Sequence, residues 1–305
     1  MNLAEGEKCD RGYLNQIISR IQYTKLNYLV VFGVLIPTPR VLFKLYKKFA
    51  KSDYIHFIYG FMGQDLVVAI LKILTKKKVV VGHHAPIFHV SKVHNLYMKY
   101  ISRHLMKVFD AHITLNSRDK KFFEDEWGVQ NVYFIPSGVD ITRFLSIERR
   151  KPHETLNFIT IGRVEDQKGV DLLLSAIEKF NKEHDKNVAK FTIAGGGTYH
   201  KMVNDFSTRN KNIDFKGFVK EDELLDIYES GDIFLSTSRE EPFGLVLVEA
   251  WASGIPVLAT KTEGPSDMVK EGDNGWFINE ISVDSVYAGI QKVYLDWLED
   301  KRVLL

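Results

Sequence analysis

The sequence has little cysteine and no apolar run long enough to cross a bilayer. Its single cysteine, Cys9, excludes an internal disulfide and a cysteine-based zinc cluster, and it favours a reducing compartment. The longest apolar run, Tyr28–Pro37, is too short to span a membrane. Residues 1–7 carry neither the basic start nor the apolar stretch of a secretory signal. We therefore expect a cytoplasmic location, and the sequence leaves peripheral contact with a membrane open.

Two further classes of site are missing from the sequence. No group of His, Asp and Glu has metal-ligand spacing, so we expect no metal and no other cofactor. No nucleic-acid-binding motif accompanies the basic residues, so nucleic acid is not an expected partner.

The charge, however, is divided unevenly along the chain. Residues 1–150 carry 23 of the 41 Lys and Arg and 12 of the 39 Asp and Glu, a net charge of +11 against −9 for the remainder. The basic N-terminal half could contact an anionic membrane or a phosphorylated lipid. Alternatively, Lys-rich segments such as 44–51 and 76–78 are ordinary solvated faces.

Strand and helix patterns alternate along most of the 305 residues, which favours an α/β protein of two domains. In the first half we expect strands at 28–33, 53–59, 78–82, 111–115 and 132–135, with helices at 39–51, 65–75, 91–108 and 117–127. In the second half we expect strands at 156–162, 190–194, 213–217, 232–238, 257–259 and 275–278, with helices at 170–184, 199–208, 221–229, 245–253, 265–270 and 283–299. The polar segment 146–154 is typical of a linker. We therefore predict domains at residues 1–145 and 155–305, each a parallel sheet with its helices.

The stretch 236–260 has the pattern of a strand, a turn, a helix and a second strand. Its turn, Arg239–Gly244, is expected at the carboxyl edge of a parallel sheet, where open α/β sheets bind ligands. The helix that begins near Phe243 would direct backbone N–H groups and the positive end of its dipole at that edge, which suits a phosphate. Glu241 in the turn and Glu249 on the helix are unfavourable beside a phosphate unless each binds another group, such as sugar hydroxyls. The alternative is that Glu241 complements the helix dipole and Glu249 is solvated.

A second polar segment, Gly162-Arg-Val-Glu-Asp-Gln-Lys-Gly169, also follows a strand and opens a helix. It places Arg163 and Lys168 at a strand's carboxyl end. A guanidinium offers a planar fork to two phosphate oxygens and an ammonium acts as a point charge, so the two together could neutralise a diphosphate. The alternative is a charged surface loop with salt bridges.

Together these motifs resemble the group-1 (family 4) retaining glycosyltransferases, which have the GT-B fold. The resemblance rests on the Gly162–Gly169 segment, on Glu241-Pro-Phe-Gly-Leu-Val-Leu-Val-Glu249 and on Ser253-Gly-Ile-Pro-Val257, and it extends from about Tyr54 to Ile278. It implies two Rossmann-like, doubly wound domains that face each other across a cleft. It also implies a metal-independent enzyme of the hexosyltransferase type, which moves a sugar from a nucleotide-diphosphate donor to a glycan or lipid-linked acceptor.

The resemblance also implies a role for each matching residue of the second half. Arg163 and Lys168 would contact the donor diphosphate, Glu249 would hold the ribose and Glu241 would contact the donor sugar. The amides of Phe243 and Gly244 would add donors to the diphosphate, and main-chain groups around Val219 would hold the base. Gly195–Gly197 could allow a close approach of backbone to ligand, or it could simply be a tight turn.

In the first half, His83 and His84 stand at the end of a strand. The family has a histidine here that faces the donor sugar and the acceptor, and alignment favours His84 over His83. Because adjacent strand residues face opposite ways, we expect only one of the two in the cleft. The alternative for such a histidine is a structural hydrogen bond.

The sequence departs from the family pattern at its start. No Gly-rich turn precedes Tyr28, where family members usually have a strand and such a turn, so we expect an incomplete N-terminal domain. This departure motivates an alternative function, a catalytically inactive or partial module that binds nucleotide sugar and acts with a partner. A sugar-nucleotide epimerase is a third alternative. A smaller departure is Asp267, which stands where the family usually has Glu.

Overall fold

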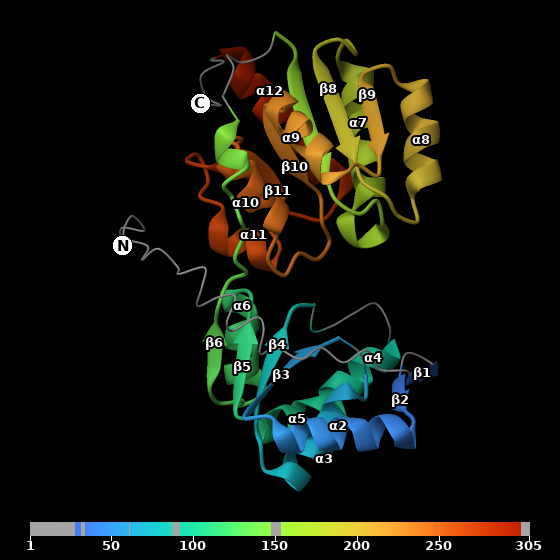
Figure 1. Cartoon of the computed structure of the whole chain (residues 1–305). Coiled ribbons are helices and arrows are strands. Elements are labelled where there is room, and N and C mark those ends of the chain that lie inside the picture. Colours follow the sequence, from blue (N-terminus) through green and yellow to red (C-terminus); the bar gives the residue numbers. More distant parts are fainter. Residues whose placement is uncertain are drawn as a thin grey trace.

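The computed structural model describes residues 28–31, 34–60, 62–85, 87, 92–147 and 154–299, and for 28–37 and Asp222 it describes the backbone only. Figure 1 shows two α/β units, one above the other, each built on its own parallel sheet. Residues 1–27, which include Cys9, and most of the predicted linker 146–154 lie outside the described residues.

The second sheet has six parallel strands in the order β12-β11-β10-β7-β8-β9. The strands are β7 (Leu156–Ile161), β8 (Ala189–Ala194), β9 (Ile213–Gly217), β10 (Ile233–Ser236), β11 (Val257–Thr260) and β12 (Gly275–Ile278). The chain winds outward from β7 to β9, returns to the middle at β10, and winds the other way to β12. The strand order therefore reverses between β7 and β10, which is where sheets of this type leave a crevice at their carboxyl ends.

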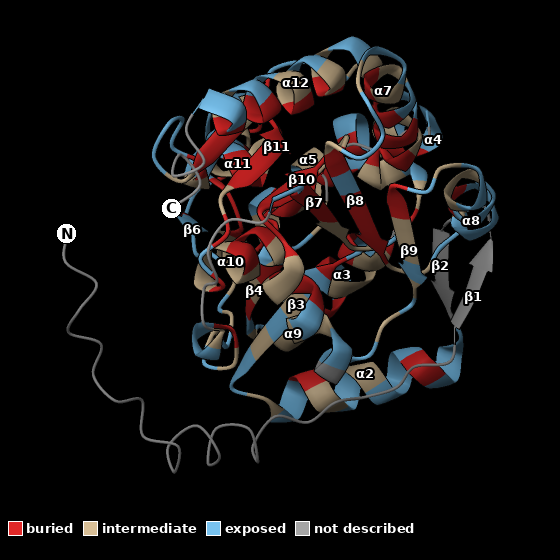
Figure 2. Cartoon of the chain, turned by 90° about the horizontal axis from the view of Figure 1, so that it is seen from above, coloured by how far each residue is buried: buried red, intermediate tan, exposed pale blue. Residues whose placement is uncertain are grey.

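Helices cover both faces of this sheet because right-handed crossovers change face when the winding direction changes. The helices are α7 (Val170–Glu183), α8 (His200–Arg209), α9 (Glu221–Ser230), α10 (Leu245–Ala252), α11 (Glu263–Met268) and α12 (Val283–Glu299). One buried core joins α7, α8 and α12 to the sheet, and another joins α9 and α10 to its other face. Figure 2 shows β10 and β11 buried, in agreement with the continuous apolar runs typical of strands covered on both faces.

The first sheet is parallel as well, and its order β3-β4-β5-β6 follows the chain in a single direction. Its strands are β3 (Tyr54–Tyr59), β4 (Lys78–His83), β5 (Ala111–Thr114) and β6 (Val132–Phe134). Its helices are α2 (Pro39–Lys51), α3 (Gln64–Thr75), α4 (Lys92–Tyr97), α5 (Arg103–Leu105) and α6 (Ser117–Lys121), and π-helical turns continue α4 at Met98–Ser102 and α6 at Phe122–Glu126. Crossovers in one direction lie on one face, and a single buried core joins these helices to the sheet.

The strand predicted at 28–33 is present, but it does not belong to the parallel sheet where we expected it. The structure instead has β1 (Tyr28–Val31) and β2 (Val34–Pro37), which pair antiparallel in a separate two-stranded sheet. The prediction treated residues 28–37 as one apolar run. The two four-residue strands pair with each other, so their backbone groups form hydrogen bonds without joining the parallel sheet. An apolar run in the sequence does not show whether a strand pairs locally or joins the parallel sheet.

The stacked pair Phe158 and Phe191, whose ring centroids lie 5.2 Å apart, gives a test of the second core. We expect Phe158→Ala to lower the free energy of unfolding by about 3–5 kcal/mol, because a fully buried ring is replaced by a cavity. Phe218→Ala, at a ring that is 81% exposed, should change it by less than about 0.5 kcal/mol. Urea unfolding measures both values, and equal effects would contradict the assigned core.

Candidate functional site

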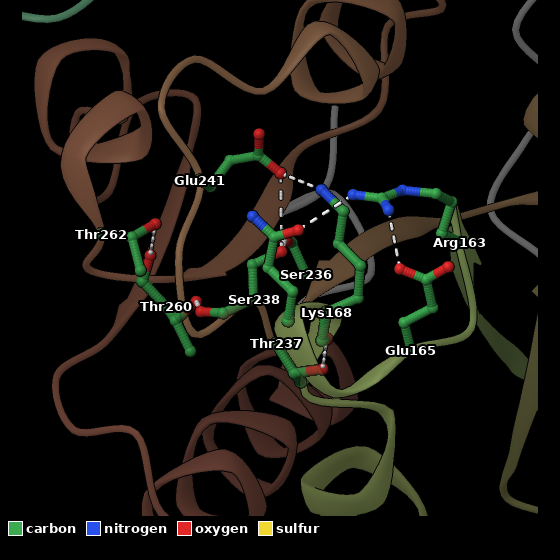
Figure 3. A network of polar contacts seen from close by, with 10 residues as sticks. Arg163, Glu165, Lys168, Ser236, Thr237, Ser238, Glu241, Thr260 and Thr262 are labelled. Carbon is green, nitrogen blue, oxygen red and sulfur yellow. Dashed lines mark hydrogen bonds and ion pairs between the residues drawn. The ribbon is translucent and has the colours of Figure 1, made fainter. Parts of the chain in front are cut away.

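The candidate site lies at the carboxyl ends of β7 and β10, at the reversal of strand order. A pocket there is lined by Gly162 and Arg163 after β7, by Lys168 before α7, and by Ser238 and Glu241 after β10. Residues from motifs about 80 positions apart in the sequence thus meet at one point, as the parallel arrangement requires (Figure 3).

The loop after β7 is fixed against the segment after β10. Gly169 has φ +62°, and a Cβ on it would lie 2.0 Å from the carbonyl oxygen of Thr237. The Thr237 hydroxyl donates to the carbonyl oxygens of Lys168 (3.0 Å) and Gly169 (3.1 Å). The amide of Arg239 donates to the Gln167 carbonyl (2.8 Å). These contacts hold the Lys168 backbone in a fixed position beside β10.

Arg239 adds a second clamp, which the sequence analysis missed. Its guanidinium donates to both carboxylate oxygens of Asp171, at 2.7 and 2.6 Å, and to the Asp166 carbonyl. The Arg239 guanidinium holds the pKa of Asp171 below its usual value. Arg239 therefore joins the turn after β10 to the first turn of α7. Bidentate pairs of this kind add geometric precision.

Lys168 and Glu241 form the central ion pair of the site (Figure 3). Their side chains are 24% and 10% exposed, so solvent screens the pair little. The Ser238 hydroxyl donates to the same Glu241 oxygen at 3.5 Å. The Glu241 carbonyl accepts from the Gly264 amide (2.8 Å), which fixes the turn against α11. An incoming anion would have to compete with the Glu241 carboxylate for the Lys168 ammonium.

Arg163 lines the same pocket but is more exposed, with 59% of its side chain accessible. Its guanidinium donates to the Glu165 carboxylate (2.7 Å) and to the Gln167 side chain (2.9 Å). Exposed pairs of this kind are weak. The guanidinium can therefore exchange Glu165 for a phosphate at small cost.

α10 begins directly after the turn that carries Glu241, although Phe243 and Gly244 do not line the Lys168–Glu241 pocket. Gly244, with φ +93°, precedes the helix, and no side chain caps its first turn. Phe243 is buried, and a Cβ on Gly264 would lie 2.1 Å from the Phe243 carbonyl oxygen, so α11 packs directly on the turn. An uncapped helix start with a rigid turn is a suitable seat for an anion.

Glu249 lies outside the Lys168–Glu241 pocket. It lines a second pocket with Arg143, Glu221 and residues 138–140. Burial holds the pKa of Glu249 above its usual value. A hydrogen bond from Tyr228 (2.8 Å) and the charge of Arg143 offset part of this increase. Arg143, whose guanidinium pairs with Glu221, and Tyr228 were not predicted as site residues, because only the tertiary fold brings them near Glu249.

The glycine segment Gly195–Gly197 contacts the loop after β7, and neither it nor Val219 lines the two pockets. A Cβ on Gly195 would lie 1.6 Å from the Gly162 carbonyl oxygen, and one on Gly197 would lie 2.5 Å from that of Val164. Close contact with the loop after β7 therefore accounts for Gly195 and Gly197. Val219 is half-buried against the core that includes α9 and α10.

The structure separates the two candidate histidines. His83 is 3% exposed and shares a 3.1 Å hydrogen bond with His112, and its ring packs on Phe123. His83 therefore belongs to the core of the first domain, which argues against its predicted catalytic role. His84 is exposed, and its ring lies with that of His56 beside Gly82, each Nε2 3.0 Å from the position of a Gly82 Cβ. His84 does not line the Lys168–Glu241 pocket.

The two domains contact each other beside the turn after β10. The Asn116 side chain donates to the Pro242 carbonyl (2.9 Å), and the Ser117 amide and hydroxyl donate to Asp267, the amide at 2.6 Å. Arg118 pairs with Glu263 at 3.1 Å. Thus the start of α6 contacts the turn that carries Glu241. The Asp267 carboxylate, which stands where the family usually has Glu, thus accepts hydrogen bonds from the first residue of α6.

Two kinds of feature are absent from the described residues. Within residues 28–299, apart from the undescribed gaps, no three His, Cys, Asp or Glu side chains are grouped so that they could hold a metal ion. No helix in this part of the chain combines the length and the apolar character that crossing a membrane requires.

Comparison with known families decides the family of the chain. The model for glycosyl transferases group 1 matches residues 143–303, which is more than half of the chain and includes both motifs of the site. The chain belongs to the group 1 glycosyl transferases. This confirms the family inferred from the motifs.

Relatives with known names match about half of this chain. An uncharacterised glycosyltransferase of Methanocaldococcus jannaschii is 35% identical over 45% of this chain and 35% of its own length. The sulfoquinovosyl transferase SQD2 of Arabidopsis thaliana is 28% identical over 55% of this chain and 32% of its own length. The matched part thus spans about a third of the length of these relatives.

Solved structures match over nearly the whole chain. HepE of Anabaena, in complex with UDP and glucose, superposes with a TM-score of 0.69 at 19% identity, covering 96% of this chain and 80% of that one. The pneumococcal O-GlcNAc transferase GtfA, in complex with UDP and GlcNAc, has a TM-score of 0.66 at 21% identity, covering 88% of this chain and 55% of that one. The fold is therefore the GT-B type predicted from the sequence.

The buried histidine pair of this group 1 chain predicts a specific pH dependence. Burial lowers the pKa of His112 from 6.5 to about 4, and burial together with His112 lowers that of His83. Between pH 6.5 and pH 4 the unfolded chain thus binds more protons than the folded one, so stability falls as the pH falls. His112 alone should account for about 3 kcal/mol.

Urea unfolding of wild type and His112→Gln across this pH range checks the assignment. The variant should show a flatter pH profile, whatever its absolute stability. His104→Gln, at an exposed position, is the matched control and should keep the wild-type slope. Identical slopes in wild type and His112→Gln would contradict a buried, neutral His112.

Proposed function

We propose that the chain is a retaining glycosyltransferase of the hexosyltransferase type, which uses a nucleoside-diphosphate sugar as donor and needs no metal. The observation that carries this proposal is the Lys168–Glu241 pair at the reversal of strand order, in one pocket with Arg163. In this pocket, Lys168 and Arg163 supply cations that could bind a diphosphate, and Glu241 supplies a carboxylate that could bind sugar hydroxyls.

The diphosphate would bind between Lys168, Arg163 and the first turn of α10. Lys168 would exchange its bond to Glu241 for a phosphate oxygen, and Arg163 would exchange Glu165 for a bidentate contact. The uncapped amides at Phe243 and Gly244 would add donors. Two cations and a helix N-terminus would then stabilise the departing diphosphate, the task that a metal ion performs in other sites.

The two carboxylates would hold the two ends of the donor. Glu241, released from Lys168, would accept hydrogen bonds from hydroxyls of the donor sugar, and it is held for this role by Ser238 and Gly264. Glu249 would accept from the ribose hydroxyls, with Tyr228 fixing one of its oxygens. Main-chain groups near Val219 would hold the base.

Transfer would proceed on one face of the sugar. The bond between the anomeric carbon and the diphosphate oxygen breaks as the acceptor oxygen bonds to the same face of that carbon, which retains its configuration. The acceptor proton passes to the departing phosphate oxygen. Closure of the domains across the Asn116–Pro242 contact would exclude water from this step.

The acceptor would bind on the side of the first domain, where His84 lies at the end of β4. A glycan or a lipid-linked sugar suits this side, and the excess of Lys and Arg in residues 1–150 favours a phosphorylated lipid carrier. The protein would act in the cytoplasm, at the membrane surface.

Donor binding tests the proposal. Calorimetry with UDP-, GDP- and ADP-sugars, in the presence of EDTA, should identify one donor class that binds to wild type. Lys168→Ala should weaken that binding by about 10- to 100-fold, because charge-assisted hydrogen bonds to the diphosphate are lost. Lys292→Ala, at an exposed lysine of α12, is the matched control and should bind as wild type does.

Transfer or slow hydrolysis of the same donor should fall at least as much in Lys168→Ala. Retention of wild-type binding within twofold would contradict the proposed diphosphate site. Tight binding with neither transfer nor hydrolysis would instead favour a nucleotide-sugar-binding module that acts with a partner.

A further inference from the structure

The helix layer of the first domain has an unusual outer surface. α3 has four exposed residues, and all four are large and apolar: Leu66, Ile70, Ile73 and Leu74. A helix on the surface of a soluble domain normally directs polar residues outward. The inner side of α3, with Ala69 and Leu71, already fills the core, so the apolar outer side has no role in packing the domain.

Two further helical segments of the first domain also expose large apolar side chains. α2 packs beside α3 and exposes Leu42, Phe43 and Tyr46, and the helical run that starts at α4 exposes Val93, Leu96, Tyr100 and Ile101. These side chains and the four of α3 are 37–64% exposed, and together they make up 11 of the 23 exposed large apolar residues in the described part of the chain. We call them the outer helix surface. Large apolar side chains exposed in this number on one layer of helices indicate an interaction site.

The charge around the outer helix surface has one sign. Residues 38–107 contain 13 Lys and Arg but only Asp53 and the buried Asp65 as acids. Exposed basic residues include Lys44, Lys47 and Lys51 on α2. The Lys47 ammonium lies 4.5 Å from the centre of the exposed Phe43 ring. Apolar side chains beside aromatic rings and basic heads are typical of helices that lie in a bilayer interface.

We infer that the outer helix surface docks on an anionic membrane, with α2 and α3 lying along the bilayer. An anionic lipid surface fits better than an apolar protein partner, because it complements both the apolar centre and the basic surroundings. In Figure 1, α2 and α3 lie below the first sheet, away from the second domain, so docking there leaves the donor site accessible. The inference deepens the proposed function and rests on it for the lipid-linked acceptor.

Vesicle flotation of the whole chain, without donor or acceptor, tests this docking. Wild type should bind vesicles in which about a third of the lipid is phosphatidylglycerol, and it should bind pure phosphatidylcholine vesicles more weakly. Ile73→Ser with Leu74→Ser should lower binding by about tenfold or more. Lys44→Ser with Lys51→Ser should lower binding to anionic vesicles only, and added salt should reproduce that loss.

The matched control is Leu295→Ser with Leu298→Ser, at exposed apolar positions of α12 in the other domain, and it should bind vesicles as wild type does. Donor binding by calorimetry on the same samples shows separately whether the proposed function holds. The inference is overturned if wild type does not bind anionic vesicles, or if Ile73→Ser with Leu74→Ser binds as wild type does. It is also overturned if that variant instead abolishes a dimer detected by sedimentation.

Discussion

The ion pair between Lys168 and Glu241 depends on almost every feature of the second domain. The two residues meet only because β7 and β10 are neighbours at the reversal of strand order. Their approach requires Gly169, since a side chain there would overlap the Thr237 carbonyl. It is fixed further by the Arg239–Asp171 clamp and by the packing of Gly264 on Phe243. The backbone thus holds both charges in place before any ligand arrives, which reduces the cost of ordering them on binding.

In the absence of a ligand the pair also protects the site from an electrostatic penalty. A lone carboxylate at the start of α10, only 10% exposed, would be costly to bury, and so would a lone ammonium. Each therefore serves as the other's partner in the absence of the proposed donor. A diphosphate sugar carries a matching partner for each charge, anionic oxygens for Lys168 and hydroxyls for Glu241. In the proposed reaction, donor binding therefore replaces the contact between Lys168 and Glu241 by two contacts to the donor, one from each residue.

The sequence predicted much of this arrangement because the second domain follows regular rules. Its strands are buried on both faces, so they are continuous apolar runs, and Gly254 with Pro256 correctly marks the end of α10. The spacing of apolar residues and the positions of turn residues do not reveal contacts between distant segments. Sequence reasoning therefore did not identify Arg143, Tyr228 and Arg239. The orientation of His83 was left open because two adjacent histidines after a strand give no local sign of which one faces the core. Packing on Phe123 and His112 decides it.

The first domain was harder to predict for a physical reason. The described strands β3 to β6 wind in one direction, so their helices form a single layer, and that layer is apolar on both sides. Hydrophobic periodicity assumes that apolar residues face a core. For α3 this assumption predicts the helix correctly, but it wrongly predicts that the apolar residues of its outer side are buried. The surface that would meet a bilayer therefore emerges only from the exposed fractions of Ile73, Leu74 and their neighbours.

The most direct test of the central claim compares two ligands on Glu241→Gln. The variant removes the carboxylate that competes for Lys168 but keeps the shape of the side chain. We expect the nucleoside diphosphate of the bound donor class to bind several-fold more tightly than to wild type, and the intact sugar nucleotide to bind more weakly, so that the ratio of the two dissociation constants changes by about tenfold or more. If both ligands change by the same factor in the same direction, Glu241 does not lie between the diphosphate and the sugar, and the account is wrong.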